Sequence, residues 1–334
     1  MDLCIDTHSH FLPVRILEML RKSGARYGTP VETRADGKTF VITPERPWGP
    51  LVPAFYDVET RLEYLDRNAI SSQVLTPPPF LFYYWTDAEL SHEIVRAENE
   101  AIAEVVAGNK GRFLGLGTVP MHHTALAVRE CELLKKDGLQ GVEIGSNVNG
   151  VDLDDERFWP IYEAAEALGL VLLIHGNNVI GNDRMKDFHL QNLLGFPADT
   201  TLAATRLIFS GVLDRFPKLK ICLGQAGGFL PYIIGRLDHG YNVRPECKRL
   251  VKSKPSEYLR RFYYDTIIHA PGPLGFLIDT VGKDRVMLGT DFPFDMGVSD
   301  VHRDIEALDV SDDQRSWLQH RTASEFFGVQ TSLQ

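Results

Sequence analysis

The sequence predicts an α/β fold: a closed (β/α)₈ barrel with a small hairpin inserted after the first strand and a helix at the C-terminal end. Two observations lead to this prediction. Short runs rich in Val, Ile and Leu recur along the 334 residues, and a segment with helical periodicity follows each run. This alternation is typical of a parallel sheet covered by helices. Eight strands and eight helices match a closed barrel, and an open doubly wound sheet is the alternative.

The predicted strands are apolar runs of the length and composition that buried strands favour. They cover residues 3–6, 72–76, 113–119, 141–145, 171–175, 220–224, 262–266 and 286–289. The predicted helices are recognised by their capping residues and apolar spacing. They cover approximately residues 58–68, 87–108, 125–136, 156–168, 200–214, 229–237, 272–281 and 301–308.

Two segments do not follow the alternation. Residues 24–55 contain ADGKT between the β-prone stretches 31–33 and 40–43, which indicates an inserted hairpin. Residues 311–327 are expected to form a terminal helix, with Ser311 as its cap and two acidic residues in its first turn. Because no repeat or linker is visible, residues 1–334 are predicted to form one domain.

Composition excludes some classes of function. The 35 Lys and Arg are scattered among 45 Asp and Glu, and the net charge of -10 argues against binding to nucleic acid. The apolar stretches are too short to cross a bilayer, and no signal sequence precedes the polar residues near position 6. The four cysteines lie far apart and form no CxxC pair, which favours a reducing, cytoplasmic location.

Polar residues at the ends of predicted strands indicate a metal site. His8 and His10 follow the first strand two residues apart, and His175 and Asp291 follow the fifth and eighth strands. Barrel enzymes carry their chemistry at these strand ends, so we expect the four side chains to meet around one divalent ion. Three imidazoles and one carboxylate suit zinc best, and also manganese, iron or cobalt.

Each of these residues also has a simpler explanation. The two first-strand histidines could be ordinary loop residues, His175 could be a core residue, and Asp291 could cap the following turn. Three strand-end matches in the right order favour the metal site over these explanations. The other histidines are weaker candidates. His122 and His123 fit a loop that enters a helix, whereas His269 follows the seventh strand closely enough to touch a substrate.

At this point the residues resemble a known family, the 2-amino-3-carboxymuconate-6-semialdehyde decarboxylases of the amidohydrolase superfamily. The resemblance covers nearly the whole chain. It rests on DTHSHFLP near the N-terminus, GxxxRFPKLKICLG, GGFLPYIIGRLD, KPSEYLRRFYYDT and DRVMLGTDFPF. It implies a barrel that binds one metal ion, usually zinc, through residues that match His8, His10, His175 and Asp291. Glu143 ends the fourth strand where two-metal relatives have a carboxylated lysine, so a second metal is not expected.

The resemblance also implies how the substrate is held. Arg46 in ERPWGP is similar to a family arginine that binds the substrate carboxylate. Arg236 in GRLD is similar to a second arginine, which in the family comes from a neighbouring subunit, so a homodimer is implied. Asn177 follows His175 where relatives have a His-Pro-Trp type of sequence, and this difference predicts a larger, more polar pocket. Phe294 is expected to contact the substrate as well.

One departure concerns catalysis directly. The family has a histidine after the sixth strand that acts as the proton shuttle, whereas this chain has Gln225. Glutamine does not titrate near neutral pH, although it can form hydrogen bonds. Loss of a general acid or base typically costs about 10²–10⁴-fold in rate. Three explanations remain open: a designed inactivating substitution, a natural residue with altered chemistry, or transfer of the proton to His269 or Asp291.

Three functions follow from these observations. The first is metal-dependent, non-oxidative decarboxylation of a small conjugated or aromatic carboxylic acid, in which Asp291 is both ligand and proton acceptor. The second is metal-dependent hydrolysis or hydration of a lactone, amide or C–C bond on the same barrel, which requires no separate histidine. The third is a non-catalytic subunit, which the retention of every predicted ligand argues against.

Overall fold

A computed structural model describes residues 3–298 and 300–329 of the chain. Residue 299 and the two ends of the predicted 1–334 domain, residues 1–2 and 330–334, lie outside this description. Seven parallel strands form the main sheet in the order β1-β5-β6-β7-β10-β11-β12. Their bounds are β1 Ile5–His10, β5 Ser72–Thr76, β6 Phe113–Gly117, β7 Gly141–Gly145, β10 Val171–His175, β11 Lys220–Leu223 and β12 Phe262–Tyr264. These strands confirm seven of the eight predicted.

The eighth predicted segment, residues 286–289, closes the barrel without forming a regular strand. On one side the backbone N–H of Met287 donates to the carbonyl of Tyr264 (2.8 Å), and on the other Thr7 N–H donates to Leu288 O (2.8 Å). Side chains replace part of the usual ladder: the backbone N–H of Thr290 donates to the buried Asp6 carboxylate at 3.1 Å. The segment therefore joins β12 to β1, as a barrel of this class requires.

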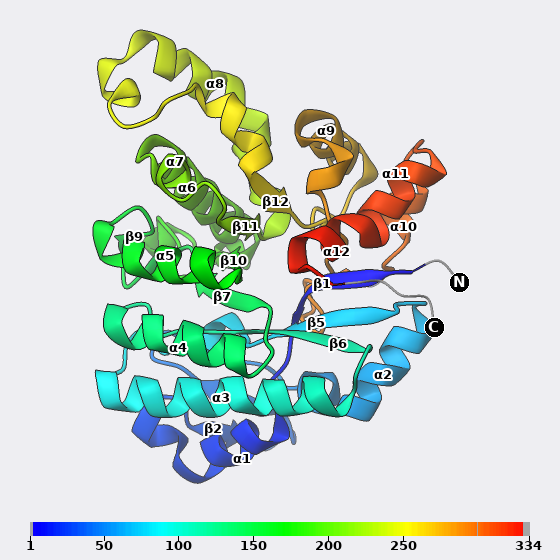
Figure 1. Ribbon diagram of the computed structural model, residues 1–334. Coiled ribbons are helices and arrows are strands. Elements are labelled where there is room, and N and C mark those ends of the chain that lie inside the picture. The colour runs from blue at the N-terminus through cyan, green and yellow to red at the C-terminus, as the bar shows by residue number, and fades with distance from the viewer. Residues whose placement is uncertain (1–2, 299, 330–334) are drawn as a thin grey trace.

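Helices cover the outside of the curled sheet (Figure 1). Their bounds are α1 Val14–Ser23, α2 Val58–Arg67, α3 Ala88–Gly108, α4 Thr124–Lys136, α5 Trp159–Leu168, α6 Phe196–Phe209, α7 Val212–Arg215, α8 Leu230–Val243, α9 Pro271–Val281, α10 Arg303–Glu306, α11 Asp312–Ser316 and α12 Thr322–Phe327. Helix α1 was not among the predicted helices. The predicted helix at 200–214 is two helices, because Gly211 between them adopts a left-handed conformation with φ 78°.

The inserted hairpin is present and has a third strand. β2 (Val31–Thr33) pairs antiparallel with β3 (Thr39–Ile42), and β4 (Pro47–Trp48) pairs antiparallel with the other edge of β3. Val41 and neighbouring side chains pack with α1 and α3 in a second apolar cluster beside the main core. In Figure 1 this unit lies at the bottom of the molecule, below α3. A further short hairpin, β8 (Asn147–Val148) and β9 (Val151–Asp152), follows β7 and was not predicted.

Strand β1 is irregular where it carries its two histidines. Its pairing with β5 shifts register between Asp6 and Ser9. The fully buried Arg61 of α2 fills the distortion, donating to Ser9 Oγ (3.1 Å) and to the carbonyl oxygen of His10. A buried guanidinium needs several acceptors to offset its desolvation, and here those acceptors lie on the irregular strand. Arg61 therefore holds the strand in the shape that positions the histidines.

The C-terminal segment is helical, as predicted. Ser311 caps α11 through a capping box with Gln314, and a π-helical turn, Trp317–Arg321, leads into α12. Leu318 in that turn accepts a hydrogen bond from Leu288 N–H (2.9 Å), which fixes the segment against the strand that closes the barrel. Across the described ranges, no helix combines the length and apolar character that crossing a membrane requires.

Candidate metal centre

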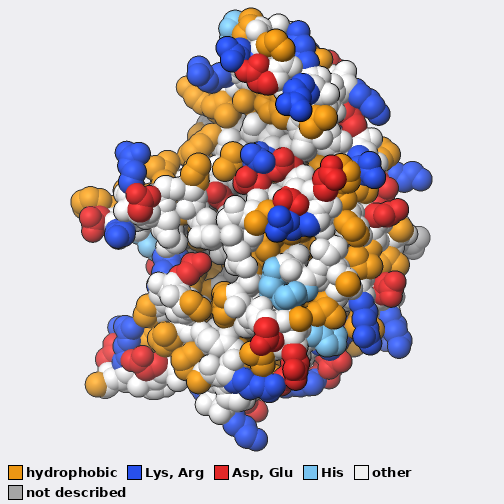
Figure 2. Space-filling view, turned by 90° about the vertical axis from the view of Figure 1, so that its left-hand side faces the viewer, with side chains coloured by type: hydrophobic (Ala, Val, Ile, Leu, Met, Phe, Trp, Pro, Cys, Tyr) orange, Lys and Arg blue, Asp and Glu red, His pale blue; other side chains and the backbone are white. Residues whose placement is uncertain are grey.

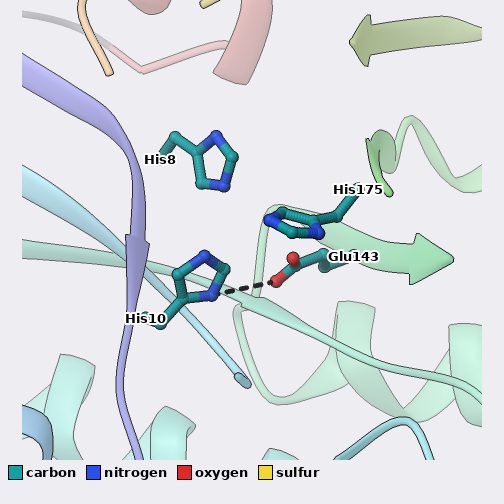
Figure 3. A group of neighbouring side chains, drawn as sticks. All are labelled: His8, His10, Glu143 and His175. Carbon is teal, nitrogen blue, oxygen red and sulfur yellow. Dashed lines mark ion pairs between the residues drawn. The ribbon is translucent and has the colours of Figure 1, made fainter. Parts of the chain in front are cut away.

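Three histidines meet inside the carboxyl end of the barrel. His8 and His10 project from β1 and His175 from the end of β10, and all three are buried. The ring centroids lie 5.1 Å apart for His8 and His10 and 5.4 Å for the other two pairs. Figure 3 shows the rings turned toward one another. The sequence prediction thus placed three side chains together from distant parts of the chain.

Hydrogen bonds fix the ring orientations. In each ring Nδ1 is engaged by an acceptor, which leaves the Nε2 lone pair for a ligand. On His8 and His10 the Nε2 atoms are buried and form no hydrogen bond within the described part of the chain. The Nδ1 acceptors are the Asp265 carboxylate for His8 (2.7 Å), the Pro77 carbonyl for His10 (3.2 Å) and the Gly176 carbonyl for His175 (2.9 Å).

Glu143 is the fourth member of this group. It is fully buried on β7, and its Oε2 lies 3.8 Å from His10 Nδ1 (Figure 3). Possible ligand atoms of Glu143 and the three histidines lie within 4.8 Å of one another, so the four residues could hold a divalent metal ion. Burial raises the pKa of Glu143, which a nearby cation would counteract. The orphaned nitrogens and this nitrogen and oxygen donor set fit a metal such as zinc or manganese.

Asp291 lies at the same point of the barrel. Its Oδ1 is 2.9 Å from His10 Nε2 and 3.9 Å from His8 Nε2. Burial would raise the pKa of this carboxyl, but the close imidazole of His10 and those of His8 and His175 outweigh burial and lower the pKa below its ordinary value. Asp291 is therefore held as a carboxylate beside the nitrogens that a metal would occupy.

The histidines differ in their affinity for protons. Burial would lower the pKa of His8, but the carboxylate of Asp265 outweighs it and raises the pKa to about 9. Burial, together with the neighbouring His8 and His10, lowers the pKa of His175 to about 3. His175 therefore offers a free lone pair at neutral pH, whereas a metal must displace a proton from His8.

Gln225 faces a cavity next to this centre. It lines a space of about 260 Å³ together with Asp291, His269, Phe196 and Met296. Both Gln225 and Ala226 adopt left-handed conformations, with φ 50° and 54°. The Asp265 carboxylate holds this turn, accepting from the backbone N–H of Gln225 (3.0 Å) and of Ala226 (2.6 Å). A side chain at position 225 is therefore placed at the wall of the site.

A second cavity, of about 420 Å³, contains the predicted arginine. Arg46 lines it with Trp48, Phe80 and Phe294. The guanidinium lies 4.1 Å from the centre of the Trp48 ring, and its Nε is buried with no hydrogen-bond partner among the described residues. Phe294 lies with its ring centre 5.1 Å from that of His10. The inserted hairpin therefore brings a cation to a cavity whose aromatic wall includes Phe294, and Phe294 in turn contacts the histidine cluster.

The remaining candidates lie farther from the centre. Asn177 lines a separate small cavity, and its carbonyl accepts from Asn147 Nδ2 at 2.6 Å. Arg236 is exposed on α8 and forms no ion pair or hydrogen bond with any described residue. The rings of His122 and His123 are tilted against each other with centres 4.2 Å apart, and His122 Nε2 donates to Thr86 O (2.9 Å). This contact fits the loop role predicted for them.

Two site residues, Glu143 and Asp265, were not predicted to take part in the site. Both are fully buried, on β7 and directly after β12. The available signal was a carboxylate inside an apolar strand, which is costly unless it meets a cation or several donors. The sequence analysis looked for polar residues that follow predicted strands, and both carboxylates fall inside them, in residues 141–145 and 262–266.

Comparison with known proteins agrees with this geometry. Residues 5–329 match the family model described as amidohydrolase. The chain belongs to the amidohydrolase family. A 2-amino-3-carboxymuconate-6-semialdehyde decarboxylase from Dictyostelium discoideum is 35% identical over 98% of this chain and 92% of its own length. A gamma-resorcylate decarboxylase from Polaromonas sp. is 31% identical over 79% of this chain and 85% of its own length.

Solved structures agree with the barrel. The amidohydrolase matches 5-carboxyvanillate decarboxylase from Sphingomonas paucimobilis with a TM-score of 0.86 and 28% identity, over 99% of this chain and 100% of the other. It matches dihydroxybenzoic acid decarboxylase from Polaromonas sp., solved with manganese and 2-nitroresorcinol, with a TM-score of 0.81 and 26% identity, over 98% and 97%. This amidohydrolase is a metal-dependent, non-oxidative decarboxylase.

Removing one nitrogen donor tests the metal centre. We expect His175→Ala to lose the metal, because the remaining ligands no longer enclose it, with a loss of affinity greater than the roughly 10–100-fold typical of outer-shell changes. Elemental analysis of purified protein measures the occupancy. His239→Ala, on the exposed face of α8, is the control and should retain wild-type metal. Equal metal content in the two variants would contradict the proposed centre.

The pKa of His8 predicts how metal binding depends on pH. Because its pKa is raised to about 9, His8 is protonated below that pH and must release a proton when a metal binds. Affinity for Mn²⁺ should therefore fall as the pH falls from 9, by at most about tenfold per pH unit. Competition with a chelator at several pH values between 6 and 9 measures this slope. An affinity that does not change over this range would contradict the assignment of His8.

Proposed function

We propose that this enzyme removes CO₂ from a small, flat carboxylic acid that is aromatic or conjugated. The observation that carries the proposal is Arg46, an unpaired cation on an aromatic wall that reaches the histidine cluster. Burial lowers the pKa of Arg46, so a carboxylate that pairs with it would relieve the cost of burying an unpaired charge. The relatives include decarboxylases named for resorcylate, carboxyvanillate and aminocarboxymuconate semialdehyde, which are acids of this kind.

The metal ligands in this proposal are His8, His10, His175 and Asp291. The 2.9 Å distance between Asp291 Oδ1 and His10 Nε2 supports Asp291 as a ligand. Glu143 is close enough to the three histidines to be a further oxygen donor. We favour zinc because three imidazoles and a carboxylate suit it, whereas the manganese found in related structures supports a second choice. A bound divalent ion supplies Lewis acidity that polarises an oxygen of the acid or of water.

The chain's own residues would hold the acid and move the proton. Arg46 grips a carboxylate through paired hydrogen bonds, and Phe294 stacks against the flat ring or conjugated chain. When the C–C bond breaks, CO₂ leaves, the electron pair of that bond moves into the conjugated system, and the carbon then takes a proton. Asp291 can accept this proton from a hydroxyl of the acid or from water before the bond breaks and then return it to the carbon, and His269 lines the same cavity as an alternative donor. Gln225 orients the acid without titrating.

The active form is proposed to be a homodimer in which Arg236 enters the partner's site. Helix α8, which carries Arg236, lies at the top of the molecule (Figure 1). Figure 2 shows hydrophobic and basic side chains gathered at that end. Tyr232 is 83% exposed and Leu250 61% exposed. Apolar side chains this exposed favour contact with another protein surface.

The four free cysteines, three of them buried, support a reducing, cytoplasmic location.

An assay of CO₂ release tests the proposed reaction. The Mn²⁺-loaded and Zn²⁺-loaded proteins are incubated with 2,6-dihydroxybenzoate, 5-carboxyvanillate and 2-amino-3-carboxymuconate 6-semialdehyde. We expect CO₂ from at least one of them and an increase of less than about tenfold in Gln225→His. An increase of about 10²–10⁴-fold would instead mean that the chain lacks a proton shuttle that histidine restores. Release of hydrolysis products without CO₂ would favour a hydrolase.

Mixing two inactive variants tests the shared site. Arg46→Ala and Arg236→Ala should each lose activity, because each removes one carboxylate contact. If subunits exchange, half of the dimers in an equal mixture carry one intact site of two, so activity should recover to about one quarter of wild type. Sedimentation measures the oligomeric state in parallel. A wild-type monomer with full activity, or a mixture no more active than its parts, would contradict the dimeric site.

A further inference from the structure

The amide of Gln225 has one hydrogen-bonded end and one free end. Thr200, fully buried on α6, places its Oγ1 3.2 Å from Gln225 Oε1 and donates to it. Nε2 of the same amide is buried and has no hydrogen-bond partner among the described residues. Gln225 lines the cavity that Asp291 also lines. An amide nitrogen buried without a partner is costly, and a ligand oxygen in the cavity would satisfy it.

The backbone beneath this amide is held equally firmly. Both oxygens of Asp265 accept backbone N–H groups of the turn, from Gln225 (3.0 Å) and from Ala226 (2.6 Å). The same carboxylate accepts from Nδ1 of His8 at 2.7 Å. The left-handed conformations of the turn, which non-glycine residues rarely adopt, are thereby fixed relative to the histidine cluster. The direction of the Gln225 side chain is then set by its hydrogen bond with Thr200.

We infer that Thr200 is a positioning residue that turns the Gln225 amide so that its N–H donors face the substrate. The inference rests on the proposed decarboxylase function. Because Thr200 holds Oε1, the NH₂ group is left without a partner at the wall of the cavity, where an anionic oxygen of the bound acid can accept from it. The opposite orientation would place the acceptor Oε1 at this wall, and an oxygen there repels the carboxylates of the acid and of Asp291, which lines the same cavity. The site thus holds a fixed neutral donor where the family's histidine would titrate.

Binding of a defined anionic ligand tests Thr200. Calorimetry on the Mn²⁺-loaded protein measures the Kd of 2,6-dihydroxybenzoate and of 2-nitroresorcinol. Thr200→Val removes the hydroxyl at nearly constant volume, and we expect the Kd to rise about tenfold, as for loss of a hydrogen bond to a charged group. Thr200→Ser keeps the hydroxyl and should restore most of the affinity. Thr205→Val, also on α6 but with no side-chain hydrogen bond to the described residues, is the control.

A double-mutant cycle separates positioning from packing. If Thr200 acts only through Gln225, Thr200→Val should weaken binding no further once Gln225→Ala is present. The inference would be overturned if the double variant lost affinity by the product of the two single losses. It would also be overturned if Thr200→Ser bound the probes as weakly as Thr200→Val. Thermal denaturation of each variant checks that it folds. Should Thr200→Val fail to fold, Thr200→Ala gives the answer, since it also removes the hydroxyl and leaves Gln225 in place; unchanged affinity there would also overturn the inference.

The outcomes for the two proposals differ. If wild-type protein releases CO₂ and binds the probes, but Thr200→Val binds them equally well, only the role of Thr200 fails. If wild-type protein neither binds the probes nor releases CO₂ from any acid tested, the proposed function fails and the inference fails with it. A tenfold loss confined to Thr200→Val and the Gln225 variants supports both.

Discussion

The site depends on one buried carboxylate, that of Asp265. It accepts hydrogen bonds from His8 Nδ1 and from the backbone N–H groups of Gln225, Ala226 and Ile267. These donors belong to β1, to the turn after β11 and to the segment that follows β12, so a single side chain joins three parts of the barrel mouth. Burying a carboxylate is costly, and four donors offset that cost only in this arrangement. The orientation of a metal ligand and the position of a catalytic turn are therefore set together.

The same contact explains why neighbouring histidines behave differently. The rings of His8 and His175 are equally buried and lie 5.4 Å apart, yet the pKa of His8 is raised to about 9 and that of His175 is lowered to about 3. His8 donates to a carboxylate, whereas His175 donates to the neutral carbonyl of Gly176. A charged acceptor stabilises the imidazolium, and a carbonyl does so much less. Because both rings are buried, the difference between their pKa values comes from the acceptor of each Nδ1 and from the neighbouring charges.

The sequence predicted the parts of this molecule that follow simple periodicities. Seven strands and helices such as α3, α4 and α9 could be found from apolar periodicity and capping residues. The three histidines could be found because strand ends carry polar residues in a barrel. The eighth predicted strand is irregular because the hydroxyls of Thr7 and Thr266 and the carboxylate of Asp6 form hydrogen bonds with its backbone groups. Helix α1 begins only four residues after His10, so its amphipathic pattern was not separated from the polar segment that carries the histidines. Glu143, Asp265 and Thr200 were missed because their roles depend on contacts across the barrel, which no local pattern encodes.

Gln225 has a clear physical consequence for the chemistry, whichever acid is the substrate. The centre already contains four buried carboxyl groups, Asp6, Glu143, Asp265 and Asp291, and three imidazoles. A fourth imidazole at position 225 would make the charge of the site vary with pH near neutrality, because histidine titrates there. An amide held by Thr200 contributes a donor of constant charge, so recognition of an anion does not change as a proton moves. Proton transfer must then pass through a different group from the one that orients the acid, and the residues that line the cavity with Gln225 leave Asp291 and His269 for that step.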